Sequence, residues 1–167
     1  LSINRDLREE TLYQQIVDRI RDIIGAHQSV VSVEPRSAGA PLLTAFSLSD
    51  KYAAWREYDV PIDGSGIYAM VAERQQPMRM TQAELEAHPR WSGFGAESTR
   101  HPPMRGWLAV PLVGSDGKTL GILQLSDKLR GEFSAEDERV AMQFAQVAVV
   151  AIERARLLEK LSVRDRF

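Results

Sequence analysis

Two apolar segments in the second half of the chain decide the fold: WLAVPLV at Trp107–Val113 and LGILQLS at residues 120–126. Between them lie the residues GSDGK, in which the Asp-Gly pair supplies the positive φ that a tight hairpin turn needs. Both faces of the two strands are largely apolar, as expected at the centre of a sheet that is covered on each side. We therefore expect this hairpin to form the middle of the core.

A long amphipathic helix should follow the hairpin. Ser134 is the expected N-cap, acidic residues occupy the first turn, and basic residues lie near the end, as the helix dipole favours. A helix over residues 135–161 would be roughly 40 Å long, which is more than a domain of this size requires. Its apolar positions also cover more of the helix surface than one sheet contact needs. We therefore expect a partner helix, or another chain, on its second face.

The first part of the chain is predicted to form a helix followed by two strands. A helix over residues 7–26 is predicted by apolar positions at steps of three and four: Leu12, Ile16, Ile20, Ile23 and Ile24. The β-branched run at residues 30–33 and the alternating segment at residues 42–48 predict a strand hairpin, because a turn rich in Ser, Gly and Pro separates them.

Two short helices are expected between the two hairpins. Asp63 is a candidate N-cap for the first of them, and Pro77 should end it, because the residue before a proline avoids helical geometry. Thr81 and Glu84 form a capping box, which predicts that the second helix begins there and runs to His88.

Composition limits the chemistry of the chain. Its 167 residues fit a single domain, and a net charge of -2 gives no general attraction to nucleic acid or to an anionic membrane. The absence of cysteine excludes disulfides, thiolate metal sites and thiol nucleophiles, and fits a reducing compartment. No apolar run approaches the roughly 20 residues that cross a bilayer. We expect a cytoplasmic segment of a longer protein, with no membrane contact of its own.

The order of these elements resembles the GAF domain family, whose members are small-molecule-sensing and dimerising modules of signalling proteins. The resemblance rests mainly on GWLAVPL at residues 106–112, the turn that follows, GILQLSD at residues 121–127, and Phe133 before the last helix. It covers residues 7–158. It implies an α+β fold: a central antiparallel sheet of five to six strands, with the long N- and C-terminal helices on one face, and short helices and a long loop on the other.

The resemblance also implies a function. Residues 89–106 look like a GAF subfamily of bacterial sensor histidine kinases, so we expect a regulatory domain that binds a small ligand, mediates dimerisation, or does both. A single GAF domain would occupy residues 1–167, with residues 159–167 beginning a linker to a covalently attached kinase or cyclase output domain. The alternatives are a ligand-free dimerising spacer and the sensory domain of a diguanylate cyclase. The isolated domain should not be an enzyme, because the sequence contains no recognisable catalytic motif.

The candidate ligand pocket lies around the long loop at residues 89–104, since loops of this length in compact domains are usually functional or disordered, and the aromatic residues here argue against disorder. Small-molecule sites combine apolar walls with a few placed polar groups. The candidate pocket residues are Trp55, Tyr58, Tyr68, Trp91, Phe94, His101, Met104 and Arg105. Arg105 could present its planar fork to a carboxylate or phosphate, or instead pair with a loop carboxylate and hold the loop down.

No cofactor and no metal are expected. The histidines lack a second ligand at metal-binding spacing, so haem, for which His101 is the candidate ligand, is disfavoured. Cysteine-linked bilins of related photoreceptors and the cysteine-dependent methionine sulfoxide reductase activity of the family are excluded by composition. The predicted partner is a second copy in a parallel homodimer through the terminal helices, with Ile16, Ile20, Val150 and Leu157 as candidate interface residues.

Overall fold

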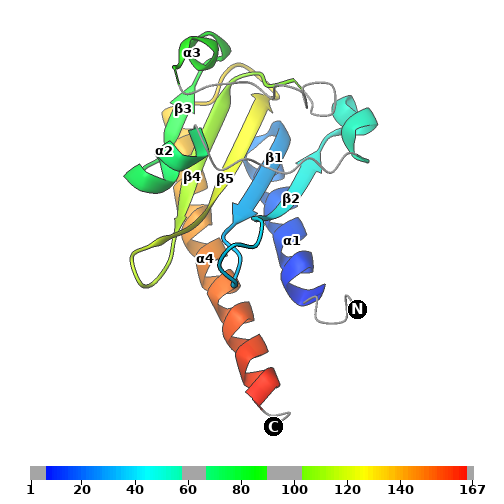
Figure 1. The fold of residues 1–167 in the computed structure, drawn as a ribbon. Coiled ribbons are helices and arrows are strands. Elements are labelled where there is room, and N and C mark those ends of the chain that lie inside the picture. The colour runs from blue at the N-terminus through cyan, green and yellow to red at the C-terminus, as the bar shows by residue number, and fades with distance from the viewer. Residues whose placement is uncertain (1–6, 58–66, 90–102, 165–167) are drawn as a thin grey trace.

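The computed structural model describes residues 7–57, 67–89 and 103–164. Its elements follow the expected order (Figure 1), and their bounds are α1 Leu7–Ile24, β1 Ala26–Val33, β2 Leu43–Leu48, the 3-10 helix η2 Asp50–Trp55, α2 Ile67–Arg74, β3 Met78–Met80, α3 Gln82–Ala87, β4 Trp107–Val113, β5 Thr119–Lys128 and α4 Ala135–Arg164. None of the described helices is long and apolar enough to cross a membrane.

The described strands form one antiparallel sheet in the order β2-β1-β5-β4-β3. In Figure 1, α1 and α4 lie behind this sheet, while α2 and α3 lie on the other side of it or at its edge. We call the face covered by α1 and α4 the proximal face and the opposite one the distal face. The expected α+β architecture, with both long helices on one face, is confirmed.

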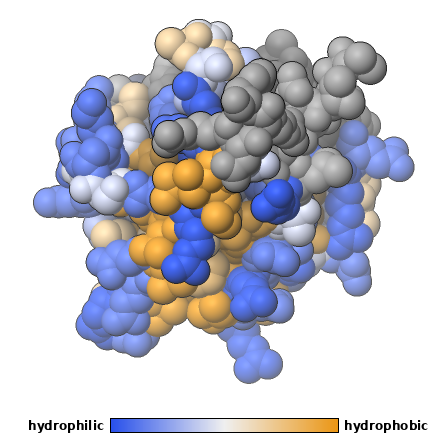
Figure 2. All heavy atoms as spheres, turned by 90° about the horizontal axis from the view of Figure 1, so that it is seen from below, coloured by the Kyte–Doolittle hydropathy of each residue, from blue (hydrophilic) through white to orange (hydrophobic). Residues whose placement is uncertain are grey.

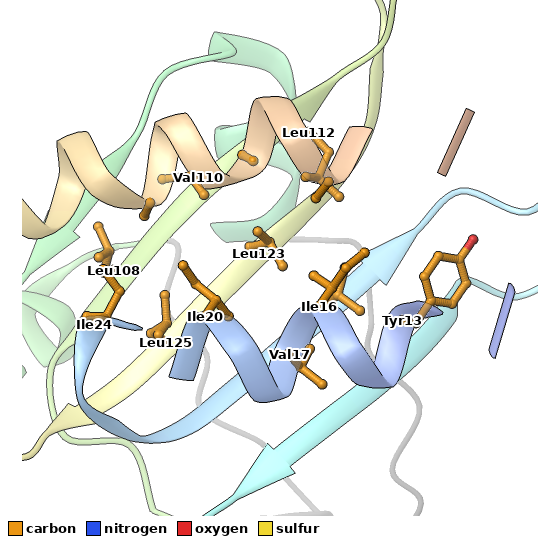
Figure 3. Close-up of a cluster of buried hydrophobic side chains, with 14 of the residues drawn as sticks. Tyr13, Ile16, Val17, Ile20, Ile24, Leu108, Val110, Leu112, Leu123 and Leu125 are labelled. Atoms are coloured by element: carbon orange, nitrogen blue, oxygen red, sulfur yellow. The ribbon is translucent and has the colours of Figure 1, made fainter. Parts of the chain in front are cut away.

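The proximal face holds the larger core. Side chains of α1 and α4 meet alternate residues of the central strands, and the view in Figure 3 shows the α1 residues pointing at the sheet. The strand residues that meet them include Val31, Val33, Leu108, Val110, Leu112, Leu123 and Leu125. Burying each such side chain contributes about 1.5–3 kcal/mol, so this layer is the main source of stability.

Two helix starts confirm the predicted capping. Thr81 Oγ1 accepts a hydrogen bond from the Glu84 N–H, and the Glu84 side chain accepts one from the Thr81 N–H. Ser134 and Asp137 exchange the same pair of hydrogen bonds at the start of α4. An Asp at this position closes the box as a Glu would, because its carboxylate still reaches the backbone of the N-cap residue.

Several helices and strands begin or end at residues other than those predicted. The first helix ends at Ile24, because Gly25 takes a positive φ of 80°, and β1 begins at Ala26, earlier than the β-branched run indicates. The helix before Pro77 ends at Arg74, and Gln75 has a positive φ of 55°. The 3-10 helix η2 was not anticipated. The proposed N-cap Asp63 lies outside the described residues.

The structure corrects part of the predicted dimer surface. Ile16 and Ile20 are 4% and 0% exposed and belong to the proximal core, as Figure 3 shows. They are covered by the chain's own sheet and by α4, so a charge there would disrupt folding rather than separate two subunits. Val150 and Leu157 on α4 are 59% and 58% exposed, which leaves both accessible to a partner.

One position in β5 requires glycine for steric reasons. A Cβ added to Gly121 would lie 2.1 Å from the carbonyl oxygen of Ser32 and 2.9 Å from the Val33 Cα, both backbone atoms of the neighbouring strand β1. Backbone atoms of a central strand cannot move away as the end of a flexible side chain can. Gly121 therefore sets how closely the two central strands approach.

We predict that Gly121→Ala lowers the free energy of unfolding by about 2–3 kcal/mol, the cost typical of overpacking. Gly117→Ala is the matched control, because Gly117 lies in the β4–β5 turn with φ 82° and no atom within 4 Å of an added Cβ. It should cost only about 1 kcal/mol for the left-handed backbone. Urea unfolding of both variants measures the free energy of unfolding. Equal decreases in the two variants would contradict the steric explanation.

Candidate functional site

The distal face differs chemically from the proximal face. Because side chains alternate along a strand, β1 directs Gln28, Val30 and Ser32 to the distal face while Val31 and Val33 enter the proximal core. The distal residues of neighbouring strands lie opposite each other and form three rows across the sheet. These rows are Leu48-Gln28-Ser126, Phe46-Val30-Gln124-Ala109 and Thr44-Ser32-Ile122-Pro111. Each row mixes apolar side chains with a hydroxyl or an amide, and none of these residues is charged.

Ser32 stands out among these polar groups. Its side chain is 0% exposed, and its Oγ has no hydrogen-bond partner among the described residues. Ser29, on the other face of the same strand, is also buried, but its Oγ donates to the Val17 carbonyl at 2.7 Å. A buried hydroxyl without a partner is costly, at about 1–3 kcal/mol, and such groups in native proteins are usually satisfied by water or a ligand.

Gln124 offers a second unused group on the same face. Its Oε1 accepts a hydrogen bond from Trp107 Nε1 at 3.0 Å, which fixes the orientation of the amide. Its Nε2 donates no hydrogen bond to another described residue. Gln124 and Ser32 are diagonal neighbours on the paired strands β1 and β5, about 7–8 Å apart at their Cα atoms.

An aromatic and apolar cluster lies beside these polar groups. Tyr68 of α2 is 7% exposed and packs with Trp107, Ile122 and other residues of α2, α3, β3 and β4. Its hydroxyl lies 3.5 Å from Glu34 Oε1, at the end of β1. Burial, and then the nearby Glu34 carboxylate, raise the pKa of the Tyr68 phenol, so this tyrosine stays protonated and can act as a hydrogen-bond donor.

The predicted pocket residues are only partly brought together. Tyr68 and Met104 belong to the same distal cluster. Trp55 lies on η2 and packs edge-on against Tyr52, with ring centroids 5.7 Å apart. Arg105 is exposed, and its backbone makes two hydrogen bonds: its N–H donates to Ser126 Oγ, and its carbonyl accepts from the Asp127 N–H. Tyr58, Trp91, Phe94 and His101 lie outside the described residues. The ligand-binding role of this set stays a prediction.

The polar residues of the sheet itself were not predicted from the sequence. Both faces of β4 and β5 were predicted to be largely apolar, and the polar groups of the site were expected in the loop. The signal was present as alternation, because Gln124 and Ser126 interleave with Leu123 and Leu125.

An ionic cluster with a buried carboxylate lies at one end of the distal face. Asp127 has a positive φ of 60°, and its Oδ2 accepts hydrogen bonds from Lys51 Nζ at 2.5 Å and the Tyr52 hydroxyl at 2.6 Å. Burial would raise the pKa of the Asp127 carboxyl, but the hydrogen bonds from Lys51 and Tyr52 outweigh it and lower that pKa. The cluster therefore attaches η2 to the end of β5. Among the described residues, no group of three or more potential metal ligands is found.

We predict that Asp127→Asn lowers stability at neutral pH and that the difference from the wild type shrinks as the pH falls. The folded state lowers the pKa of Asp127, so the carboxylate stabilises the fold above its ordinary pKa of about 3.9 and loses that effect in acid. Asparagine also tolerates a positive φ, so the substitution removes the charge of residue 127 without adding backbone strain. Denaturant unfolding at several pH values measures the difference in the free energy of unfolding.

The control Asp50→Asn alters an exposed carboxylate paired with Arg56 and should change the free energy of unfolding little. A constant difference for Asp127→Asn down to strongly acidic pH would contradict the assignment.

Comparisons with solved structures agree with this architecture. The GAF domain of a phosphoenolpyruvate-protein phosphotransferase from Coxiella burnetii superposes with a TM-score of 0.71 at 20% identity, covering 95% of this chain and 90% of that chain. The GAF domain of cyanobacteriochrome TePixJ superposes with a TM-score of 0.67 at 16% identity, covering 93% and 94%. At these identities the likeness shows a shared fold.

Among curated proteins, the chain is similar to the dual 3',5'-cyclic-AMP and -GMP phosphodiesterase 11 of Drosophila melanogaster, with 30% identity over 100 residues. The match covers 58% of this chain but only 6% of the phosphodiesterase, so it concerns one small part of that protein. The family model described as "GAF domain" matches residues 6–153, most of the chain. The sheet order, the two long helices on one face and this match together show that the chain belongs to the GAF domain family, as a regulatory domain.

Proposed function

We propose that the chain is the sensory domain of a bacterial signal-transduction protein and that it binds a small molecule over the distal face of its sheet. The observation that carries the proposal is the fully buried Ser32 hydroxyl, which has no partner among the described residues. A ligand group that exchanges a hydrogen bond with this hydroxyl would remove the cost of leaving it unpaired.

The chemistry of the face defines the class of ligand. Ser32 and Gln124 provide a hydroxyl and two amide protons, the buried apolar side chains of Trp107 and Ile122 lie beside them, and no charge lies in the three rows. The part of the ligand over the sheet should therefore be uncharged, flat and able to accept hydrogen bonds, as a heterocyclic ring is. The similarity to a cyclic-nucleotide phosphodiesterase makes cyclic AMP and cyclic GMP the first probes.

Strand β5, which carries Gln124, is also connected to both long helices. Immediately after Asp127, the Lys128 ammonium donates at 2.8 Å to the carbonyl of Ile24 at the end of α1 and to the carboxylate of Asp137 at the start of α4. A ligand that shifts β5 would therefore act on the positions of α1 and α4. Ligand binding changes that equilibrium only if the two states differ in affinity.

We further propose that the output domain is a histidine kinase and that the domain works in the cytoplasm. The support for the kinase is the resemblance of residues 89–106 to GAF domains of bacterial sensor kinases. A diguanylate cyclase output is the alternative, and a ligand-free spacer is the alternative to sensing.

We predict opposite effects for two serine variants of the same strand. Ser32→Ala removes a hydroxyl that has no partner, so it should leave the stability of the ligand-free protein unchanged or raise it, while weakening ligand retention. Ser29→Ala removes a satisfied hydrogen bond on the proximal face, so it should cost about 1 kcal/mol of stability and leave retention unchanged.

Native mass spectrometry of the purified chain, and thermal shifts with cyclic AMP and cyclic GMP, measure retention, and denaturant unfolding measures stability. A retained molecule, or a shift with either nucleotide, that Ser32→Ala reduces and Ser29→Ala does not would support sensing at this face. The absence of any retained molecule and of any shift would favour the spacer. A stability loss in Ser32→Ala would show that the hydroxyl has a structural partner.

A further inference from the structure

A buried carboxylate lies at the end of the proximal face where α4 leaves the sheet. Glu9, in the first turn of α1, is 5% exposed, which is rare for a charged residue unless it is paired. In Figure 1 the start of α1 and the end of β1 lie at this lower end of the sheet, and α4 projects beyond it. Figure 2, which views the molecule from below, shows hydrophobic side chains near the middle of this face and hydrophilic ones around them.

Glu9 accepts hydrogen bonds from three side chains in three parts of the chain. Arg156 of α4 donates through Nε to Glu9 Oε1 at 2.9 Å, and the arginine side chain is itself only 16% exposed. Arg36, which follows β1, pairs with Glu9 Oε2. The Tyr13 hydroxyl donates to Glu9 Oε1, and in Figure 3 it points away from the apolar side chains of the core. Burial, and then the hydrogen bond to Glu9, raise the pKa of the Tyr13 phenol, so it remains a donor.

Arg156 also binds a second element of the domain. Its Nη2 donates to the backbone carbonyl of Glu34, just after β1, at 2.8 Å. One guanidinium therefore holds α1 through Nε and the end of β1 through Nη2. The planar fork of arginine makes both hydrogen bonds from fixed directions, which the single ammonium of a lysine does not. Arg156 thus fixes its part of α4 against two neighbouring elements.

These contacts matter because the hydrophobic core does not extend to this part of α4. Ile152 is the last buried residue among the described side chains of α4, and the helix continues to Arg164. The attachments that follow are polar and are made by Glu153, Arg156 and Glu159, which lie on one side of the helix at steps of three. We call residues 153–164 the outgoing part of α4. It is held by charges and hydrogen bonds rather than by the core.

The other end of α4 is held in a different way. There Lys128 joins the end of α1, at the Ile24 carbonyl, to Asp137 at the start of α4. The two helices therefore run antiparallel, with an ion pair at each end of their contact. Ile24 itself belongs to the proximal core, so the Lys128 end cannot separate without opening that core. Only the end with Glu9 and Arg156 lies beyond it.

We propose that Glu9 and Arg156 form a clamp that couples the first turn of α1 directly to the outgoing part of α4. When the clamp opens, the outgoing part of α4 detaches while the proximal core stays folded. Opening breaks the ion pair but returns both charged groups to water, and for buried pairs these two terms largely offset each other. The closed and open states are therefore close in free energy, and a displacement of α1 can shift the balance between them.

This coupling is separate from ligand binding. It joins the two helices through side chains on the proximal side of the domain and involves neither Ser32 nor Gln124. The clamp therefore acts on α4 whether or not the distal face holds a small molecule. A failure of the clamp would leave the proposed ligand site untouched, and the reverse also holds.

Hydrogen–deuterium exchange of the purified chain tests the clamp, because a helix end without tertiary contacts frays and loses amide protection. Arg156→Gln should speed exchange at residues 153–160 by about tenfold or more and leave residues 141–149 unchanged. Arg154→Gln is the matched control, since it makes the same change at an exposed arginine of the same helix, and it should alter neither region.

Two further measurements separate coupling from simple fraying. Arg156→Gln should also speed exchange in the first turn of α1, because a coupling between two sites acts in both directions. Glu9→Gln should reproduce both effects, and the double variant should exceed neither single variant, since both substitutions remove the same interaction.

Arg156→Lys is the second variant if Arg156→Gln does not fold. It keeps the charge but loses the fork, so it should speed exchange in the same two segments by a smaller factor. Rapid exchange at residues 153–160 in the wild type would overturn the proposal. Equal effects of Arg156→Gln and Arg154→Gln, or an increase that extends equally through residues 141–149, would overturn it as well.

Discussion

Burial of the proximal face against α1 and α4 is the constraint on which the rest of the structure depends. Both helices use one side to cover the central strands, and the hydrophobic free energy is concentrated in this layer. Because the layer supplies most of the stability, the distal face does not have to be uniformly apolar. It can carry Gln28, Ser32 and Gln124 in the middle of the sheet, where a purely structural domain would gain more from valine or leucine.

The end of β5 connects these two layers. Asp127 and Lys128 are consecutive, yet Asp127 binds Lys51 and Tyr52 beside the distal face, while Lys128 binds the ends of α1 and α4. Burial would raise the pKa of Asp137, but the hydrogen bonds from Lys128 and Ser134 and the charge of Lys128 together outweigh it and lower that pKa, as expected for an ion pair that holds a helix start. A displacement of this strand end thus reaches both the segment near the candidate site and the start of α4.

The elements that the sequence predicted well are those with strong local signals. The β4–β5 hairpin has an Asp-Gly turn, the Thr81 and Ser134 caps are local, and α4 has an uninterrupted period. The start of β1 was missed because His27, Gln28 and Ser29 are polar, and this segment is a strand through its pairing with β2 and β5, which lie farther along the chain. The polar distal face was missed although the alternation of Gln124 and Ser126 with Leu123 and Leu125 indicated it. Ile16 and Ile20 were assigned to a dimer because periodicity shows that a helix has an apolar face but not what covers it.

The central claim is that a small molecule occupies the distal face above the paired strands β1 and β5. A crystal structure of the purified protein tests it most directly. We expect electron density for a bound molecule with polar atoms within hydrogen-bond distance of Ser32 Oγ and Gln124 Nε2. Side chains of the protein itself packed directly onto both groups, with their hydrogen bonds satisfied and no room for a ligand, would contradict it.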